Sequence, residues 1–100
     1  MTTRSRRRRT ERIASLPVEL RYFRAFADGS GVDCLIDVGP FKYACHVLGT
    51  ARSVHLLNSG SWSYQDSIAA ADRARAAFGE ALATLPPDWH AANLAMYAPG

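Results

Sequence analysis

The segment from Val32 to Val47 constrains the fold most, because its two halves match when the chain is folded about Gly39-Pro40. On one face every pair is apolar: Val38 with Phe41, Ile36 with Tyr43, Cys34 with Cys45, and Val32 with Val47. On the other face the pairs are Asp37 with Lys42, Leu35 with Ala44, and Asp33 with His46. A slip of one residue would mix the two faces, so hydrophobicity and charge specify the same register. The pattern predicts an antiparallel hairpin, in which Gly39 suits the first position of a type II′ turn.

The residues after Val47 predict a third strand that returns along the second one. A turn over residues 49–52 would set Val54 opposite Val47 and Leu56 opposite Cys45, which extends the apolar face. On the polar face it would set His55 beside His46 and Leu57 beside Ala44. We therefore expect a three-stranded antiparallel sheet that ends near residues 58–60.

A long helix is expected next. Ser63 followed by Asp66 is a capping-box pattern with Asp in place of Glu, and Leu85-Pro86-Pro87 ends the helix near Thr84. The apolar stripe at spacings of three and four consists of Tyr64, Ile68, Ala71, Phe78, Leu82 and Leu85. Arg75 interrupts this stripe. We expect it to reach the sheet edge or to pair with an acid such as Asp33 or Asp37, and a ligand-facing arginine is the alternative.

Residues 16–27 carry two competing patterns. Leu16, Leu20, Phe23 and Ala27 recur at helical spacing between a start signal at Ser15-Leu16-Pro17 and a stop signal at residues 28–31, and this favours a helix. Val18, Leu20, Tyr22 and Phe26 alternate with polar residues, so a strand is the alternative. The fold class is then α+β, with a shorter N-terminal helix, the three-stranded sheet and the long helix packed on one face. The domain spans residues 13–85, between a basic arm over residues 1–12 and a tail or short helix over residues 86–100 in which Asp88 is a candidate cap.

This element order resembles that of a double-stranded RNA binding domain over residues 16 to 85. The shared features include Gly39-Pro40 between strands and an alanine-rich last helix. That family contacts phosphates with lysines at the start of its last helix. Here residues 63–67 read Ser-Tyr-Gln-Asp-Ser, with an acid and no lysine. The resemblance therefore concerns topology, and the family's binding residues are not carried over to this chain.

Positive charge is concentrated at the N-terminus. Residues 1–12 hold six of the twelve basic residues and one acid, Glu11, whereas the rest of the chain has a net charge of −2. Arginine binds phosphate through a planar fork of donors, so we expect the arm to contact nucleic acid or a nucleoprotein. The candidate contacts are Arg4, Arg6, Arg7, Arg8, Arg9 and Arg12, with Arg21 and Arg24 extending the basic surface. An acidic protein partner and a merely solubilising tail are the alternatives.

A protein-protein interaction module, such as an inhibitor or adaptor, is the second functional interpretation. Its candidate contacts are an apolar strip of Leu35, Ala44 and Leu57, together with Trp89, Met96 and Tyr97 in the tail. An apolar strip flanked by charge is typical of a protein-binding face.

A small metal-dependent enzyme is the least favoured interpretation. Asp33, His46 and His55 would lie in one row, and two histidines with a carboxylate can hold a metal ion or orient a general base. A solvated or structural role is favoured for all three. Cys34 and Cys45 lack the Cys-x-x-Cys spacing of zinc ribbons, so we expect core thiols that form a disulfide only if oxidised.

The remaining expectations are absences. The sequence has no phosphate-binding Gly-rich loop, nucleophile elbow or dinucleotide fingerprint, so we expect no enzymatic activity, cofactor or metal. It also has no secretory signal and no apolar run of about twenty residues, which favours a cytoplasmic protein without a membrane contact. The Ala- and Arg-rich composition favours a bacterial or phage source.

Overall fold

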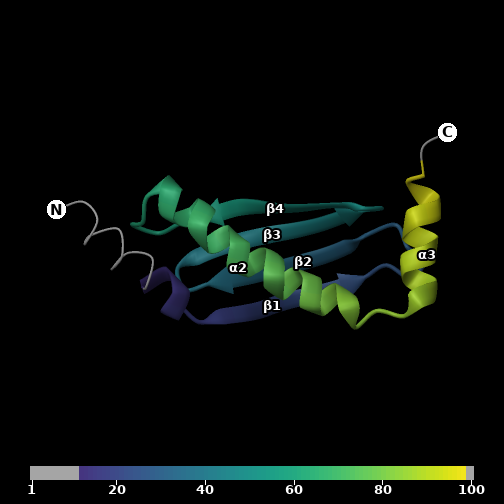
Figure 1. Ribbon diagram of the computed structural model, residues 1–100, viewed down its shortest axis with the longest axis horizontal. Helices are drawn as coiled ribbons and strands as arrows, with labels where there is room; N and C mark the ends of the chain where they lie inside the picture. Colours follow the sequence, from purple (N-terminus) through teal and green to yellow (C-terminus); the bar gives the residue numbers. More distant parts are fainter. Residues whose placement is uncertain (1–11, 99–100) are drawn as a thin grey trace.

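The computed structural model describes residues 12–98 and shows an α+β fold in two layers. A four-stranded antiparallel sheet forms one layer, and a long helix crosses one of its faces (Figure 1). The elements are β1 (Val18–Ala25), β2 (Val32–Val38), β3 (Phe41–Leu48), β4 (Ala51–Asn58), α2 (Tyr64–Ala83) and α3 (Pro87–Met96). A helical turn over residues 12–15 precedes β1. The strand order is β1-β2-β3-β4, so every strand pairs with its neighbours in the sequence.

The predicted central hairpin is confirmed. Its observed pairs are Val38 with Phe41, Asp37 with Lys42, Ile36 with Tyr43, Leu35 with Ala44, and Cys34 with Cys45. The connection is the two-residue loop Gly39-Pro40, and Gly39 has a φ of 55°, as the first position of a type II′ turn requires. The amide of Gly39 donates a hydrogen bond of 2.9 Å to the carbonyl of Pro17, which fixes this turn to the start of β1.

The predicted N-terminal helix is wrong, and the sheet has four strands rather than three. Residues Val18–Ala25 form β1, in which Leu20 pairs with Ile36 and Tyr22 with Leu35. Arg21 lies between these two pairs as a β-bulge. The bulge places Leu20 and Phe23, three residues apart, on the same face of the sheet, and this spacing imitates a helix. The helix-first order of a double-stranded RNA binding domain is therefore not found.

The hairpin between β3 and β4 has a tighter turn than predicted. Its loop is Gly49-Thr50, and Val54 pairs with Cys45 rather than with Val47. Leu56 pairs with Tyr43, and a second bulge at Leu57 separates this pair from Lys42 with Asn58. The register differs from the predicted one by two residues, so the side chains up to Leu56 keep their predicted faces.

Helix α2 begins and ends where the sequence predicts. The hydroxyl of Ser63 accepts a hydrogen bond from the amide of Asp66 (3.2 Å), and Thr84 is the C-cap residue. The face that packs on the sheet is rotated from the predicted stripe, since Tyr64 and Ile68 are 70% and 53% exposed. The buried apolar positions are Ala70, Ala71, Ala74, Phe78 and Leu82. The three alanines among them let the helix lie close to the sheet.

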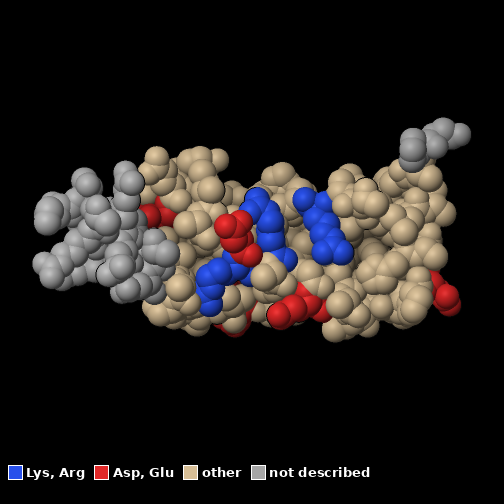
Figure 2. Space-filling view, viewed as in Figure 1, with Lys and Arg blue, Asp and Glu red and all other residues tan. Residues whose placement is uncertain are grey.

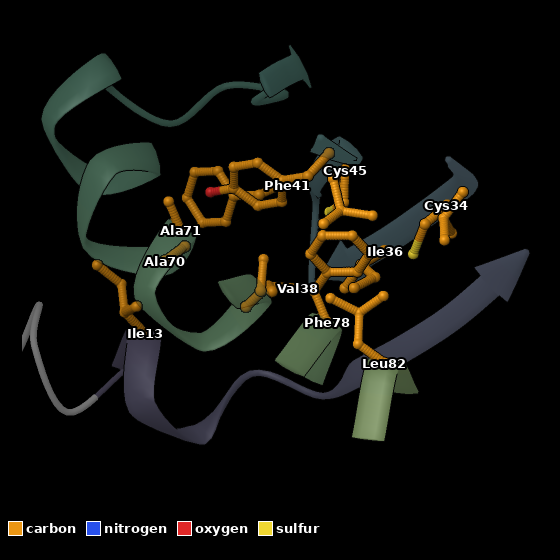
Figure 3. Packing of buried hydrophobic residues seen from close by; sticks show 14 of the residues in the cluster. Ile13, Cys34, Ile36, Val38, Phe41, Cys45, Ala70, Ala71, Phe78 and Leu82 are labelled. Atoms are coloured by element: carbon orange, nitrogen blue, oxygen red, sulfur yellow. The ribbon is translucent and has the colours of Figure 1, made fainter. Parts of the chain in front are cut away.

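The hydrophobic core lies between α2 and the two central strands (Figure 3). Ile36 and Val38 of β2, Phe41 of β3 and Phe78 of α2 all belong to this buried cluster. All the core positions of the sheet lie on one face, and among residues 12–98 no helix covers the opposite face. We call that uncovered surface the open face.

Helix α3 lies within residues 86–100, for which a tail or short helix was predicted, and closes one end of the sheet (Figure 1). Trp89 Nε1 donates a hydrogen bond of 2.7 Å to the carbonyl of Phe26, and Asn93 Nδ2 donates one of 2.8 Å to that of Gly29. Pro86, not Asp88, is the N-cap residue of α3. In the described part of the chain neither helix is both long and apolar enough to cross a membrane.

Candidate interaction surfaces

The predicted basic arm lies mostly outside the described residues. Arg4, Arg6, Arg7, Arg8 and Arg9 belong to that part, and Arg12 is the first described residue. The Arg12 guanidinium lies 4.9 Å from the centre of the Trp62 ring, in a cation–π arrangement. This contact is at the end of the sheet where α2 begins, opposite α3 (Figure 1).

The helical turn that follows Arg12 is fixed to α2. Arg73 Nη1 donates a hydrogen bond of 2.7 Å to the carbonyl of Ile13 and a second one to that of Leu16. The Ile13 side chain is buried in the core. Charge-assisted bonds to backbone carbonyls are stronger than neutral ones, so the point at which the N-terminal segment joins the domain is well defined.

A polar hollow of about 350 Å³ lies beside this junction. It is lined by Arg12, Ser61, Trp62, Ser63 and Asp66. Ser63 is the N-cap of α2, and its hydroxyl also donates to Asp66 Oδ2 at 2.8 Å. Trp62 packs edge-on against Phe41, with ring centroids 5.3 Å apart. The hollow therefore combines one cation and one aromatic ring with a carboxylate.

Arg21 and Arg24 lie on β1, apart from Arg12. Arg21 lies on the open face and forms an ion pair with Asp37, with Nη1 3.2 Å from Oδ2. Lys42 Nζ lies 3.2 Å from the same oxygen, so Asp37 is shared by two cations. Arg24 follows Val18 by six residues along β1, which is about 20 Å at 3.3 Å per residue. It therefore lies far from the end where Arg12 is placed.

On the side of the molecule where α2 lies, the described surface carries charged side chains of both signs. In Figure 2 basic and acidic side chains alternate over the middle of this face. Arg75 pairs with Asp72 within α2, with Nη1 3.0 Å from Oδ1, and its side chain is about half exposed. Arg75 thus pairs with an acid, as one of the predicted outcomes has it, but the partner is Asp72 of its own helix, because Asp33 and Asp37 lie on the far side of the sheet.

The open face carries a row of four side chains across all four strands, which we call the middle row. Tyr22 pairs with Leu35, Leu35 with Ala44, and Ala44 with His55. One charged row lies on each side of it. The first contains Glu19, Asp37, Lys42 and Asn58, and the second consists of the pair Arg24 with Asp33 and the pair His46 with Ser53.

Of the three apolar residues predicted for protein binding, Leu35 and Ala44 lie together on the open face, whereas His55 takes the place beside Ala44 that was predicted for Leu57. Leu35 and Ala44 are direct partners, and Leu57 lies in the bulge of β4 next to the middle row. Leu35 is 40% exposed and Leu57 is 60% exposed, while Ala44 is half-buried. Tyr22 and Leu35, which are paired in the middle row, form a small exposed patch with polar neighbours, and Leu57 is exposed in β4.

The predicted contacts in the tail divide into two groups. Trp89 is only 8% exposed and donates a hydrogen bond to the carbonyl of Phe26, so its side chain is buried within the domain. Tyr97 donates a hydrogen bond of 2.5 Å to the carbonyl of Ser30 and remains partly exposed. Met96 is about half exposed and forms part of the outer surface of α3.

The two strand histidines come together, but not with enough other ligands to form a metal centre. The rings of His46 and His55 have centroids 5.5 Å apart, with His55 paired to Ala44 rather than to His46. Asp33 of β2 pairs with Arg24 of β1 on the same open face. Within residues 12–98 no group of three or more His, Cys, Asp or Glu side chains could hold a metal ion.

Cys34 and Cys45 are buried, unoxidised core residues, directly opposite each other on β2 and β3. A hydrogen bond between the two thiols lowers the pKa of Cys34. The same bond, together with burial, raises the pKa of Cys45. Since both groups face the core, they contribute packing and present no thiol to a substrate.

Three surface residues were not among the predicted contacts. Tyr22 and Lys42 lie on the open face, and Trp62 lies beside Arg12. Tyr22 was hidden by the helical interpretation of residues 16–27, and the strand alternative would have placed it on the face of Leu20, because the bulge at Arg21 has no signal in the sequence. Trp62 lies in the loop before α2, where no periodic pattern indicates its neighbours.

Comparison of this chain with protein-family models, curated proteins and solved structures found no match.

Proposed function

We propose that this chain is a small non-catalytic binding protein whose Arg-rich N-terminal arm contacts nucleic acid or a nucleoprotein. The observation that carries this proposal is the segregation of charge in the sequence. Six arginines lie within residues 1–12, whereas the rest of the chain has a net charge of −2. A polyanion is therefore attracted to one end of the chain and not to its body.

The surroundings of Arg12 support a contact at this end. Its guanidinium lies over Trp62 at one side of a polar hollow, and the following turn is fixed to α2 by Arg73. An aromatic ring beside an arginine is suited to an unstacked base, and the arginine to a phosphate. The expected affinity is insensitive to sequence, because phosphate contacts position a protein without reading bases.

The rest of the domain supports this division of roles. Arg21 and Lys42 are both paired with Asp37, and Arg75 is paired with Asp72. Cations that are paired with neighbouring carboxylates attract phosphate less strongly than unpaired ones. We therefore assign the phosphate contacts to Arg4, Arg6, Arg7, Arg8, Arg9 and Arg12, and not to Arg21 or Arg24.

The test is a binding titration with labelled single-stranded and duplex RNA and DNA over a series of salt concentrations. Neutralising about five phosphates gives a log-log slope with salt of roughly −4. Replacing all six arm arginines by glutamine in the full chain should abolish this binding. The matched control replaces Arg21 and Arg24 by glutamine and should retain the slope. Binding that persists without the arm arginines would refute the proposal.

The alternative function is a protein-interaction module, and the exposed patch on the open face favours it. Leu35, Leu57 and Tyr22 are exposed next to charged rows. This alternative predicts a partner complex that survives the loss of the arm arginines but is lost on Leu35→Lys. The two functions thus respond to different substitutions.

A further inference from the structure

We propose that the open face is a homodimer interface, in which two copies pack face to face about a two-fold axis that runs parallel to the strands between β2 and β3. This proposal stands on the composition and register of the open face. It does not depend on the binding of nucleic acid by the arm.

The open face is electrically balanced, which disfavours a polyanion as its occupant. Three cations, Arg21, Arg24 and Lys42, lie on it with three carboxylates, those of Glu19, Asp33 and Asp37. Its middle row is largely apolar or aromatic, and Tyr22 is 45% exposed. A face with an apolar centre and balanced charges fits a protein surface of matching pattern.

A second copy of the chain supplies such a pattern. On the open face β2 carries the acid or the large apolar side chain of a strand pair, and β3 carries the base or the small one. A two-fold axis parallel to the strands places β2 of one copy over β3 of the other. Asp37 then faces Lys42 of the second copy, and Asp33 faces His46. Between them Leu35 faces Ala44, so a large side chain meets a small one. The first and third of these pairs follow from the observed register of the two strands, and Asp33 with His46 follows when that register is continued by one residue beyond Cys34 and Cys45.

The other in-plane two-fold axis, perpendicular to the strands, gives a mismatch. It would place β2 over β2 of the second copy, with the strands running in opposite directions. Leu35 would then face Leu35, and Asp33 would face Asp37. Two desolvated carboxylates in contact are unfavourable, so the charges select the parallel arrangement. Aligned sheets of this kind pack at about 30° to each other. The residues of β2 therefore lie most directly over those of β3 of the second copy near the two-fold axis.

The arrangement also places both N-terminal arms on one side of the dimer. A rotation about an axis parallel to the strands leaves the ends of the sheet where they were. Arg12 of each copy therefore lies at the same end, beside the turn at Gly39-Pro40. If the arms bind nucleic acid as proposed above, the dimer presents two of them to one strand, which raises the effective affinity.

The experiment measures the mass of the full chain in solution by light scattering and sedimentation, over a series of concentrations and without nucleic acid. The wild-type chain should be a dimer. Leu35→Lys should raise the dissociation constant roughly a hundredfold, because each of the two symmetry-related contacts loses a factor of about ten. Ala44→Glu should have a similar effect. Ile68→Lys is the matched control, since Ile68 is an exposed apolar residue of α2, and it should leave the dimer intact.

The decisive sample is an equimolar mixture of the Leu35→Lys and Ala44→Glu chains. In the proposed register Lys at position 35 of one chain faces Glu at position 44 of the other, so the mixture should form a heterodimer although each chain alone is monomeric. Circular dichroism of each variant confirms that it is folded. A monomeric wild-type chain, a dimer insensitive to Leu35→Lys, or a mixture that stays monomeric would each overturn the proposal.

Discussion

The phenol of Tyr43, on the third strand, donates a hydrogen bond of 2.5 Å to the carbonyl of Ser67, near the start of α2. The Tyr43 side chain is only 2% exposed. The bond therefore links the middle of the sheet to the helix inside the core. It also fixes the rotation of α2, so that the alanine-rich side faces the sheet and Ile68 faces solvent.

The buried phenol predicts a loss of stability at high pH. Burial raises the pKa of Tyr43 from 10.0 to about 12, so the folded chain holds this proton more tightly than the unfolded chain. The free energy of unfolding should be unaffected by this group below pH 10 and should fall between pH 10 and about 12, by about 2 to 3 kcal/mol. Urea denaturation across this range measures the effect.

Tyr43→Phe isolates the contribution of Tyr43 from that of other titrating groups. At neutral pH the variant should lose about 1 kcal/mol, for the missing hydrogen bond. Its stability should then decline less than that of the wild-type chain above pH 10. Equal declines in the two chains would show that the phenol does not control this transition.

Phe78→Ala should destabilise the domain strongly, because the ring is buried among Ile36, Val38 and Leu82 in the core. The expected loss in the free energy of unfolding is about 3 to 5 kcal/mol. Ile68→Ala on the same helix, at an exposed position, should cost less than about 0.5 kcal/mol. Similar losses for the two variants would contradict the observed rotation of α2.

Two glycines of the β1–β2 connection form a matched pair for testing the docking of α3. Gly29 has a φ of 81°, and a Cβ there would lie 2.7 Å from Cβ of Ala92 in α3. Gly29→Ala should therefore cost more than about 1 kcal/mol and reduce hydrogen-exchange protection in α3. At Gly31 the nearest atom to an added Cβ is 3.8 Å away, so Gly31→Ala should be nearly neutral. A well-tolerated Gly29→Ala would mean that α3 does not pack as described.

Arg12→Gln should change the salt dependence of nucleic-acid binding by a defined amount. If Arg12 contacts one phosphate, the log-log slope on duplex DNA should become less steep by roughly 0.9. Arg24→Gln, on the distant end of β1, should leave the slope unchanged. The same titration assay measures both, and an equal change for the two variants would argue against a contact localised at the arm.

The sequence was most informative where two independent patterns specified the same structure. The register of the β2–β3 hairpin followed from apolar pairs such as Ile36 with Tyr43 on one side and the Asp37–Lys42 charge pair on the other. The caps of α2 followed from Ser63 and from the prolines after Leu85. In each case two independent signals specified one structure.

The sequence was least informative at the sheet edges. The bulge at Arg21 shifts the alternation of β1, so that Leu20 and Phe23 acquire a helical spacing. The pairing of β4 differs by two residues because residues 51 and 52 add to the strand instead of the turn. Edge strands are paired on one side only, so their pattern is less tightly specified.

The interaction surfaces were predicted only in part, because they depend on which face of the sheet stays uncovered. Leu35 and Ala44 were placed together correctly by their register, but the place beside Ala44 that was predicted for Leu57 is taken by His55. Tyr22 joins them only when residues 16–27 are a strand. The arrangement of Arg12 over Trp62 joins residues fifty positions apart in a loop and a helical turn, and no local periodicity connects them.

The nearest-neighbour order of the strands has a consequence for how the chain folds while it is being synthesised. All pairings of the sheet join consecutive strands, so each hairpin can form as soon as its second strand appears. The apolar surface of Ile36, Phe41 and Tyr43, however, is covered only by α2, which follows all four strands. The nascent sheet therefore exposes its core face until residues up to Leu82 have been added. During that interval the chain is most susceptible to aggregation, and α2 acts as the last element that protects it.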